Sequence, residues 1–186
     1  MAKKLIAART GSILSSLTIA LALLLSACLI TPRAFAAPLD GLSRIGKGKM
    51  DWLWLELYQA SLYSADGRYE AGRFPLALEI RYSRDIKASD LLDATEGEWQ
   101  KQGLAQADIK RHLALLKSVW VNVKTGDTLL LVATNSNQGE FFHNGQSLGV
   151  VEQADIMQAF LGIWLRSDTS EPTLRAQLLG EASCDC

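Results

Sequence analysis

Histidine is scarce in this chain. Only two histidines, His112 and His143, occur among 186 residues, and no short ligand spacing joins them. A structural zinc site needs four ligands and a catalytic site three, drawn from His, Cys and carboxylate side chains. The chain also lacks a glycine-rich phosphate-binding loop of either common kind. We therefore expect no bound metal and no cofactor.

An excess of basic residues is absent as well. The chain has 19 Lys and Arg against 20 Asp and Glu, a net charge of -1. Residues 1–36 hold four of the basic residues and none of the acidic ones, so the remainder carries a charge of -5. Proteins that bind nucleic acid or anionic lipid surfaces present basic clusters. The composition therefore argues against nucleic acid as a partner.

Cysteine is rare too, and Cys28, Cys184 and Cys186 are the three present. The last two can form a disulfide in an oxidising compartment, either within this tail or with another chain. So short a loop constrains the unfolded chain little, and two cysteines are too few for a zinc site. We expect a frayed terminal tail, because chain ends are commonly loose.

The first 36 residues have the pattern of an export signal. Lys3, Lys4 and Arg9 give a positive start, Ser12–Ile30 is uncharged and mostly apolar, and Ala34–Ala36 offers a small-x-small cleavage site. A retained transmembrane anchor is one alternative, since about 20 apolar residues can span a bilayer. We expect cleavage after Ala36, a periplasmic location and one domain at residues 37–186.

Leu25–Cys28 allows another interpretation of the same segment, because it resembles the lipobox of bacterial lipoproteins. In those proteins the cysteine becomes the lipidated first residue of the mature chain. Leu29 and Ile30 continue the apolar run beyond Cys28, which favours cleavage after Ala36. A lipoprotein anchored at Cys28 is the alternative, and only then do we expect contact with a membrane.

Strand periodicity occurs in several segments after the leader. Residues 38–51 are rich in glycine and lysine, which is typical of a loop or a short edge strand. Large residues on both faces of residues 52–58 predict a central strand covered on each side. Alternation predicts strands at residues 76–82 and 128–134, and Asn144-Gly145 between apolar runs predicts a hairpin.

Four further segments have the three- and four-residue spacing of helices. We expect them from Ser89, as N-cap, to Gly103, then Ile109–Trp120, Ile156–Trp164 and Pro172–Gly180. Strands and helices are grouped rather than strictly alternating. The sequence therefore predicts an α+β fold, with a largely antiparallel β-sheet and helices packed on one face.

Gly145–Gly149 matches the G-x-S-x-G pattern of the serine hydrolase elbow. That elbow joins a strand to a helix and needs a histidine later in the chain. Here the pattern lies in the predicted hairpin and both histidines precede Ser147, so we assign no nucleophile. We expect His112 at a helix boundary between core and solvent, and His143 in a turn.

Aromatic residues are plentiful for a core of this size, and they either line an apolar cavity or pack against each other in an ordinary core. The residues in question are Trp52, Trp54, Tyr58, Tyr63, Tyr82, Trp99, Trp120 and Trp164.

Several segments together resemble the chalcone isomerase-like family, in its exported bacterial branch. They are Leu57–Tyr63, Leu76–Tyr82, Lys124–Asp127, Phe160–Leu165 and the residues within Thr169–Gly180. The resemblance covers nearly all of the chain after the leader. It implies a large antiparallel sheet with helices layered over it, an open-faced β-sandwich, and a ligand cleft between the layers.

The family's plant enzymes cyclise chalcones to flavanones. In them an arginine and a threonine on neighbouring strands work with a tyrosine and an asparagine on the helical side. Here Tyr58 stands where the threonine would be, and residues 87–95 offer neither tyrosine nor asparagine. The resemblance therefore implies that chalcone cyclisation is lost.

The family's plastid relatives bind fatty acids, and in them an arginine and a tyrosine grip the carboxylate. On that pattern Tyr58 would pair with Arg44, with Lys47 and Lys49 as substitutes and Tyr63 as a further ligand-binding residue. A guanidinium can bind a carboxylate through two parallel hydrogen bonds, and a phenol adds a third donor. Burial of the tail would give the affinity, at about 0.8 kcal/mol per methylene.

Three functions remain open at this point. The first is an exported, non-catalytic protein that binds a fatty acid or other apolar carboxylate between sheet and helices. The second is an isomerase, an intramolecular lyase acting on a phenolic or enone substrate, in which Tyr58 would need a pKa lowered toward working pH. The third is a partner-binding envelope protein attached through the Cys184–Cys186 tail or a lipidated Cys28.

Overall fold

The structure is a computed structural model that describes residues 38–186. The predicted signal peptide at residues 1–36, its cleavage after Ala36 and the alternative lipid anchor at Cys28 lie outside the described residues. Within the described range the chain forms six strands and four helices.

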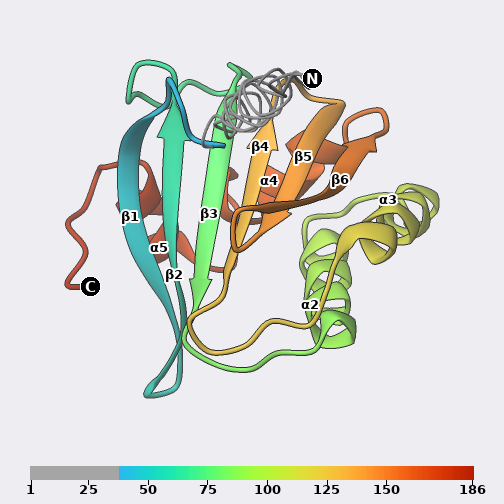
Figure 1. The fold of residues 1–186 in the computed structure, drawn as a ribbon, viewed down its shortest axis with the longest axis horizontal. Helices are drawn as coiled ribbons and strands as arrows, with labels where there is room; N and C mark the ends of the chain where they lie inside the picture. Colours follow the sequence, from blue (N-terminus) through green and yellow to red (C-terminus); the bar gives the residue numbers. More distant parts are fainter. Residues whose placement is uncertain (1–37) are drawn as a thin grey trace, which may run out of the picture. The chain divides into compact units, whose positions relative to one another are not determined.

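All six described strands belong to one sheet, which is antiparallel throughout and follows the order of the chain from β1 to β6 (Figure 1). Helices α2 and α3 are inserted between β3 and β4, and α4 and α5 follow β6. The strands are β1 (Ser43–Trp52), β2 (Leu55–Ser64), β3 (Leu76–Tyr82), β4 (Thr128–Ala133), β5 (Gln138–His143) and β6 (Gln146–Glu152). The helices are α2 (Ala88–Lys101), α3 (Gln106–Val119), α4 (Ile156–Leu165) and α5 (Pro172–Leu178).

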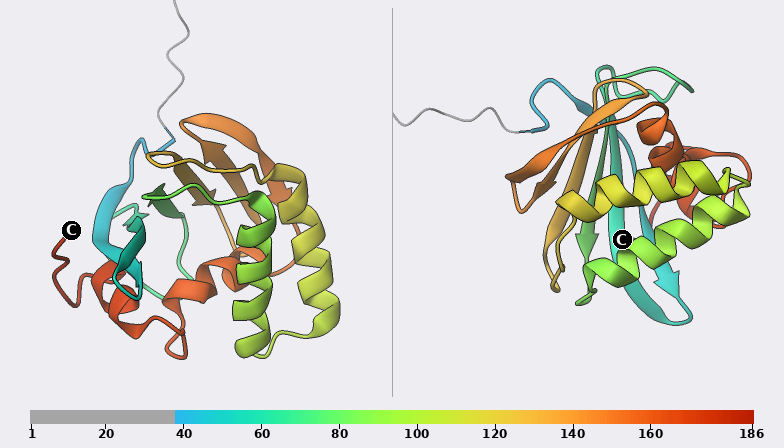
Figure 2. Two further views of the ribbon diagram at one scale, coloured as in Figure 1. Left: turned by 90° about the horizontal axis from the view of Figure 1, so that it is seen from below. Right: turned by 90° about the vertical axis from the view of Figure 1, so that its right-hand side faces the viewer.

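The helices lie together on one face of the sheet (Figure 2). Successive side chains of a strand point to opposite faces, and the core forms where the apolar set meets the helices. Ala60 and Leu62 of β2 and Leu78 and Ile80 of β3 belong to this buried set. The predicted α+β fold, with an antiparallel sheet and helices on one face, is confirmed.

Helix α4 is buried on nearly every side, since eight of its ten residues are buried. A helix that is apolar all round belongs between other elements rather than at a surface. Helix α2 packs over it, because the indole Nε1 of Trp99 donates to the Ala159 carbonyl at 2.9 Å. The side-chain amide of Gln102 donates to the Gly162 carbonyl at 3.1 Å. These bonds fix α2 as the outer layer.

The glycine-rich segment forms β1, a full ten-residue strand rather than the expected loop or short edge strand. Its glycines serve packing. A Cβ at Gly46 would lie 2.2 Å from the Gln177 carbonyl oxygen, and one at Gly48 would lie 2.6 Å from Leu174 Cδ1. Because β1 carries no side chain at these positions, α5 can approach its backbone directly.

The central strand predicted at residues 52–58 is confirmed only for Leu55–Tyr58, which begin β2 between β1 and β3. β1 ends at Trp52 and pairs there with Leu55, the first residue of β2, so Leu53 and Trp54 form a two-residue turn. Leu53 has a φ of 59°, in the left-handed region. Trp54 is 83% exposed. The alternation of large residues therefore marks a hairpin tip and not burial on two faces.

The N-terminus of α2 also differs from the expectation, because its N-cap is Lys87 and not Ser89. Asn122, far along the chain, supplies the missing acceptor: its Oδ1 receives the Ala88 backbone N–H at 2.9 Å. Ser89 instead donates from its hydroxyl to Asp90 Oδ1. A cap from a distant residue has no local signature in the sequence.

His112 lies in the interior and not at the predicted boundary with solvent, since it is 2% exposed. Its Nε2 lies 3.2 Å from the Ala154 carbonyl, to which it donates, and its ring centroid lies 5.5 Å from that of Trp99, edge to face. Nδ1 has no hydrogen-bond partner among residues 38–186. Burial lowers the pKa of His112, which keeps the ring neutral.

The hairpin predicted around Asn144-Gly145 is confirmed as the β5–β6 turn, with φ of 50° and 79° at these two residues. Ser147 lies in β6 and its hydroxyl donates to Glu140. The G-x-S-x-G pattern is therefore part of a hairpin and not a nucleophile elbow. None of the helices described has the length and apolar character needed to cross a bilayer.

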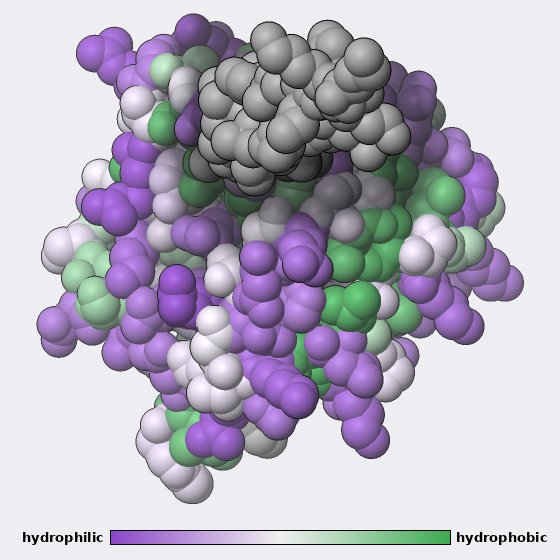
Figure 3. All heavy atoms as spheres, viewed as in Figure 1, coloured by the Kyte–Doolittle hydropathy of each residue, from purple (hydrophilic) through white to green (hydrophobic). Residues whose placement is uncertain are grey.

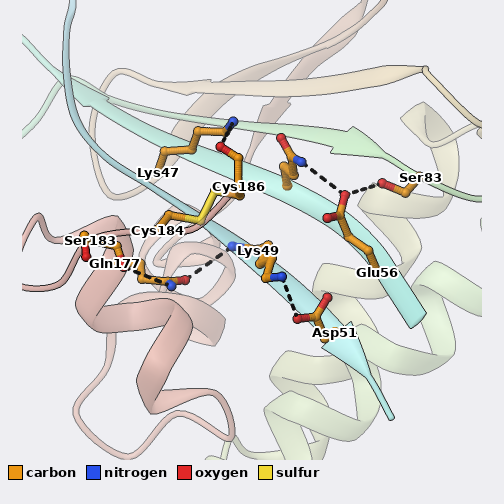
Figure 4. The surroundings of a disulfide bond; sticks show 10 residues. Lys47, Lys49, Asp51, Glu56, Ser83, Gln177, Ser183, Cys184 and Cys186 are labelled. Atoms are coloured by element: carbon orange, nitrogen blue, oxygen red, sulfur yellow. Dashed lines mark hydrogen bonds and ion pairs between the residues drawn. A yellow bond between two sulfur atoms is a disulfide. The ribbon is translucent and has the colours of Figure 1, made fainter. Parts of the chain in front are cut away.

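The C-terminal tail contains a disulfide between Cys184 and Cys186 (Figure 4). Of the two pairings considered, the structure has the one within the tail. Lys47 of β1 donates from Nζ to the Cys186 backbone oxygen at 3.3 Å. The tail therefore lies beside β1.

Candidate functional site

A cavity of about 580 Å³ lies between the sheet and the helices. Its lining is mostly apolar and comes from strands β1 to β5, from α2 and α4 and from the connections between them. A cavity of this size is in the range of small-molecule sites. The aromatic members of the lining are Tyr58, Tyr82, Trp120, Phe141, Phe160 and Trp164.

These aromatic side chains form a continuous wall centred on Phe160 of α4. Its ring centroid lies 5.3 Å from that of Trp164, 5.7 Å from Trp120 and 5.5 Å from Phe141, all edge to face. Edge-to-face pairs in this distance range are favourable beyond the area that they bury. The abundance of aromatic residues in the sequence thus has two uses here, since they pack against each other and line the cavity.

Tyr58 of β2 stands at the cavity wall opposite α4. Its hydroxyl oxygen accepts a hydrogen bond of 2.9 Å from the indole Nε1 of Trp164. Its partner on β3 is Tyr82, whose ring lies 6.1 Å away, edge to face. Burial in these apolar surroundings raises the pKa of Tyr58 to about 12, and burial raises the pKa of Tyr82 as well. Both phenols are therefore neutral at working pH.

This shift bears on acid–base chemistry. A general base needs a pKa near the operating pH, and the pKa of Tyr58 is moved in the opposite direction. The site can offer a phenolic proton as a hydrogen-bond donor, but it does not prepare a phenolate.

Acidic side chains line the open side of the cavity. Asp90 and Lys101 of α2 are exposed, whereas Glu98 and Glu171 are partly buried. The Lys101 ammonium lies 2.7 Å from Glu98 Oε1 and pairs with it. Burial, followed by the charge of Glu98, raises the pKa of Glu171. The lining therefore holds three carboxylates and one ammonium group, and that ammonium is already paired.

The residues proposed as a carboxylate clamp do not gather around Tyr58. Arg44, Lys47 and Tyr63 line a separate hollow of about 200 Å³, where they are joined by Gln59, Ser61, Glu79 and Arg81. Strand alternation places this hollow on the face of the sheet away from the helices. Figure 3 views that face, on which hydrophilic residues predominate. Tyr63 donates there to Glu79 Oε2 at 3.1 Å.

The pairing of β1 with β2 gives the physical reason. Tyr58 pairs with Met50, which lines the cavity, whereas Lys49 pairs with Gln59 one position further on. A shift of one residue moves a side chain to the other face of a sheet. Lys49 instead forms an ion pair of 3.4 Å with Asp51 (Figure 4). Of the predicted ligand-binding residues, only Tyr58 lines the cavity.

Helix α2 contributes lining residues that sequence reasoning missed. Asp90, Ala94, Gly97 and Lys101 recur at intervals of three and four, so they share one side of the helix. In the sequence, a stripe of small and charged residues beside the apolar stripe of a helix could have indicated residues at the edge of a cavity. A Cβ at Gly97 would meet no atom within 4 Å, so this point of the wall is unfilled.

No metal cluster is present in the described part of the chain, where no three His, Cys, Asp or Glu side chains are close enough to hold an ion.

Comparison with known proteins places this geometry in context. The family model for chalcone isomerase-like proteins matches residues 42–180. An uncharacterized protein of Haemophilus influenzae is 27% identical over 146 residues, which cover 78% of this chain and 72% of that protein. The crystal structure of a fatty-acid binding protein of Arabidopsis thaliana superposes with a TM-score of 0.57 at 13% identity, over 79% of this chain and 91% of that one. The chain belongs to the chalcone isomerase-like family.

Proposed function

We propose that this protein binds one apolar ligand in the cavity between sheet and helices and does not transform it. The observation that carries the proposal is the cavity itself, about 580 Å³ with a largely apolar lining. The likeness in fold to a plant fatty-acid binding protein supports a ligand with an acyl-like body. The raised pKa of Tyr58 supports a binding role over acid–base catalysis.

Hydrophobic burial suffices for useful affinity. An alkyl chain with about ten buried methylenes gains about 8 kcal/mol at 0.8 kcal/mol each. Loss of ligand freedom offsets about 4 kcal/mol or more of that gain. The net binding free energy is therefore favourable, and we expect the affinity to rise with the length of the apolar chain until the cavity is full.

Filling the cavity tests the proposal. Gly97→Phe adds a large side chain at a point where nothing lies within 4 Å of the new Cβ. Replacing a mid-helix glycine also favours the helix, so we expect the variant to fold. Native mass spectrometry of the purified protein should find a bound lipid in wild type and none in the variant. Displacement of an apolar fluorescent probe should show the same loss.

Gly97→Ala is the matched control. It also raises helix propensity, by about 1 kcal/mol and more than Phe does, but occupies little of the cavity. Retained binding in Gly97→Ala together with lost binding in Gly97→Phe would support the cavity as the site. Equal probe affinity in all three proteins would contradict it.

We also propose that the chain works after export. The support is the pattern of residues 1–36, with its basic start, apolar run and Ala34–Ala36 site. This is tested by mass spectrometry of the protein recovered from a periplasmic extract, because its mass identifies the first residue of the chain. A mass beginning at Ala37 supports cleavage after Ala36, whereas membrane retention that is lost in Cys28→Ser supports the lipoprotein alternative.

A further inference from the structure

The charges around the cavity are arranged against an anionic ligand. Asp90, Glu98 and Glu171 line it, and no arginine of residues 38–186 does. Lys101, the one lysine of the lining, is paired with Glu98 at 2.7 Å. Ser170 adds a further bond, since its hydroxyl donates to Glu98 Oε2 at 2.7 Å. A carboxylate arriving at this rim would meet like charges and no free cation.

The deeper part of the cavity is no better suited to a negative charge. An ionised carboxylate taken out of water needs a paired cation or several donors. Arg44 and Lys47 belong to the hollow on the other face of the sheet. Among the side chains that line the cavity with Tyr58 most are aromatic or aliphatic, and the charges of Glu171 and Glu98 reach the phenol, since burial and then these two charges raise its pKa.

A hydrogen-bond donor is nevertheless available there. Trp164 donates to the Tyr58 oxygen, and the phenolic proton of Tyr58 has no acceptor among residues 38–186. A buried hydroxyl commonly finds a partner. The raised pKa of Tyr58 keeps that proton in place across the physiological range. The wall of the cavity thus holds an oriented donor with no acceptor of its own.

We propose that the ligand is an apolar molecule that presents an uncharged hydrogen-bond acceptor, such as a ketone, quinone or ester carbonyl, to the Tyr58 hydroxyl. The inference rests on the proposed function and narrows it, because it replaces the carboxylate end expected from the sequence with a neutral one. Tyr58 then fixes orientation, while the aromatic wall and the aliphatic lining bind the body of the ligand.

Four probes with similar apolar chains test the inference: dodecane, methyl decyl ketone, dodecanoate and dodecylammonium. Their dissociation constants can be measured on the full chain by displacement of an apolar fluorophore at neutral pH. We expect the ketone to bind about tenfold more tightly than dodecanoate, because its uncharged carbonyl avoids both the desolvation of an ionised carboxylate and the repulsion by the acidic lining. Tyr58→Phe should weaken the ketone about fivefold and leave dodecane unchanged.

A second variant keeps the test independent of Tyr58. Glu171→Gln removes one carboxylate from the lining, so we expect tighter dodecanoate binding and an unchanged ketone affinity. Dodecanoate binding as tightly as the ketone in wild type, or dodecylammonium binding most tightly, overturns the inference and leaves the proposed function standing. Failure of every probe to bind, dodecane included, overturns the proposed function itself.

Discussion

The indole Nε1 of Trp164 in α4 donates a 2.9 Å hydrogen bond to the hydroxyl of Tyr58 in β2. This bond joins the helical layer to the sheet at the cavity wall, between residues separated by 106 positions in the chain. Because the Tyr58 oxygen already accepts from Trp164, the phenolic hydrogen must point away from the indole.

The bond between these two residues should be measurable as a coupling energy. We expect Tyr58→Phe to lower the free energy of unfolding by about 1 kcal/mol, since it leaves the Trp164 N–H without its partner. A double-mutant cycle with Trp164→Phe, followed by urea denaturation, should give a coupling of about 0.5–1.5 kcal/mol. Additive losses would show that the two side chains do not interact in solution.

Chalcone cyclisation should not be accelerated by this protein. Burial raises the pKa of Tyr58 to about 12, so the phenol keeps its proton at neutral pH and is a poor general base. Absorbance of a chalcone substrate at about neutral pH should decay at the uncatalysed rate. A wild-type rate above background that disappears in Tyr58→Phe would restore the isomerase alternative.

Stability should fall on mild acidification because of His112. Burial lowers its folded-state pKa below the ordinary histidine value of about 6.5, so below that pH the unfolded chain binds a proton that the folded chain does not. The free energy of unfolding is therefore unaffected by His112 above about pH 6.5 and decreases as pH falls from there toward the folded-state pKa. Urea midpoints measured across this range should show the decrease.

The control is a variant without the titrating ring, and His112→Leu is suitable in the buried site. We expect it to be less stable than wild type at alkaline pH, since the bond to Ala154 is lost. Its stability should depend less on pH between about 6.5 and 5. Ring chemical shifts followed by NMR offer a direct reading, and a folded-state pKa at or above 6.5 contradicts the assignment.

Gly46 should tolerate no side chain. A Cβ there would lie 2.2 Å from the Gln177 carbonyl oxygen, which belongs to the backbone of α5 and cannot rotate away. Gly46→Ala should therefore cost about 1–3 kcal/mol in the free energy of unfolding, as overpacked positions do. Gly97→Ala, where the new Cβ meets nothing, should instead be neutral or stabilising. Equal effects of the two substitutions would disagree with the contact between β1 and α5.

The segments with a clear local pattern could be predicted from the sequence. Leu76–Tyr82 alternates and forms β3, and Asn144-Gly145 supplies the turn between β5 and β6. The apolar spacing around Ile156–Trp164 places α4 correctly. In each case the residues that determine the element lie within it.

In several of the failures a residue distant in the sequence decides the outcome. Gly46 indicates flexibility until α5 is known to lie over it. The cap of α2 comes from Asn122. The family resemblance implies a pair of Arg44 with Tyr58, but the pairing of β1 with β2 is irregular between Arg44 and Gly46 and decides which face each side chain occupies. The cavity residues of α2 were missed because their helix stripe is polar.

The chain-order arrangement of the six strands has a consequence for folding kinetics. The longest connection between neighbouring strands of the described chain is the one from β3 to β4, which contains α2 and α3. Closing a longer loop costs more entropy before contacts compensate for it. We therefore expect two three-stranded halves to form early and their joining to limit the rate. Tyr58 and Tyr82 come from the first half and Phe141 from the second. A ligand that contacts all three can therefore bind, and stabilise the fold, only after the two halves have joined.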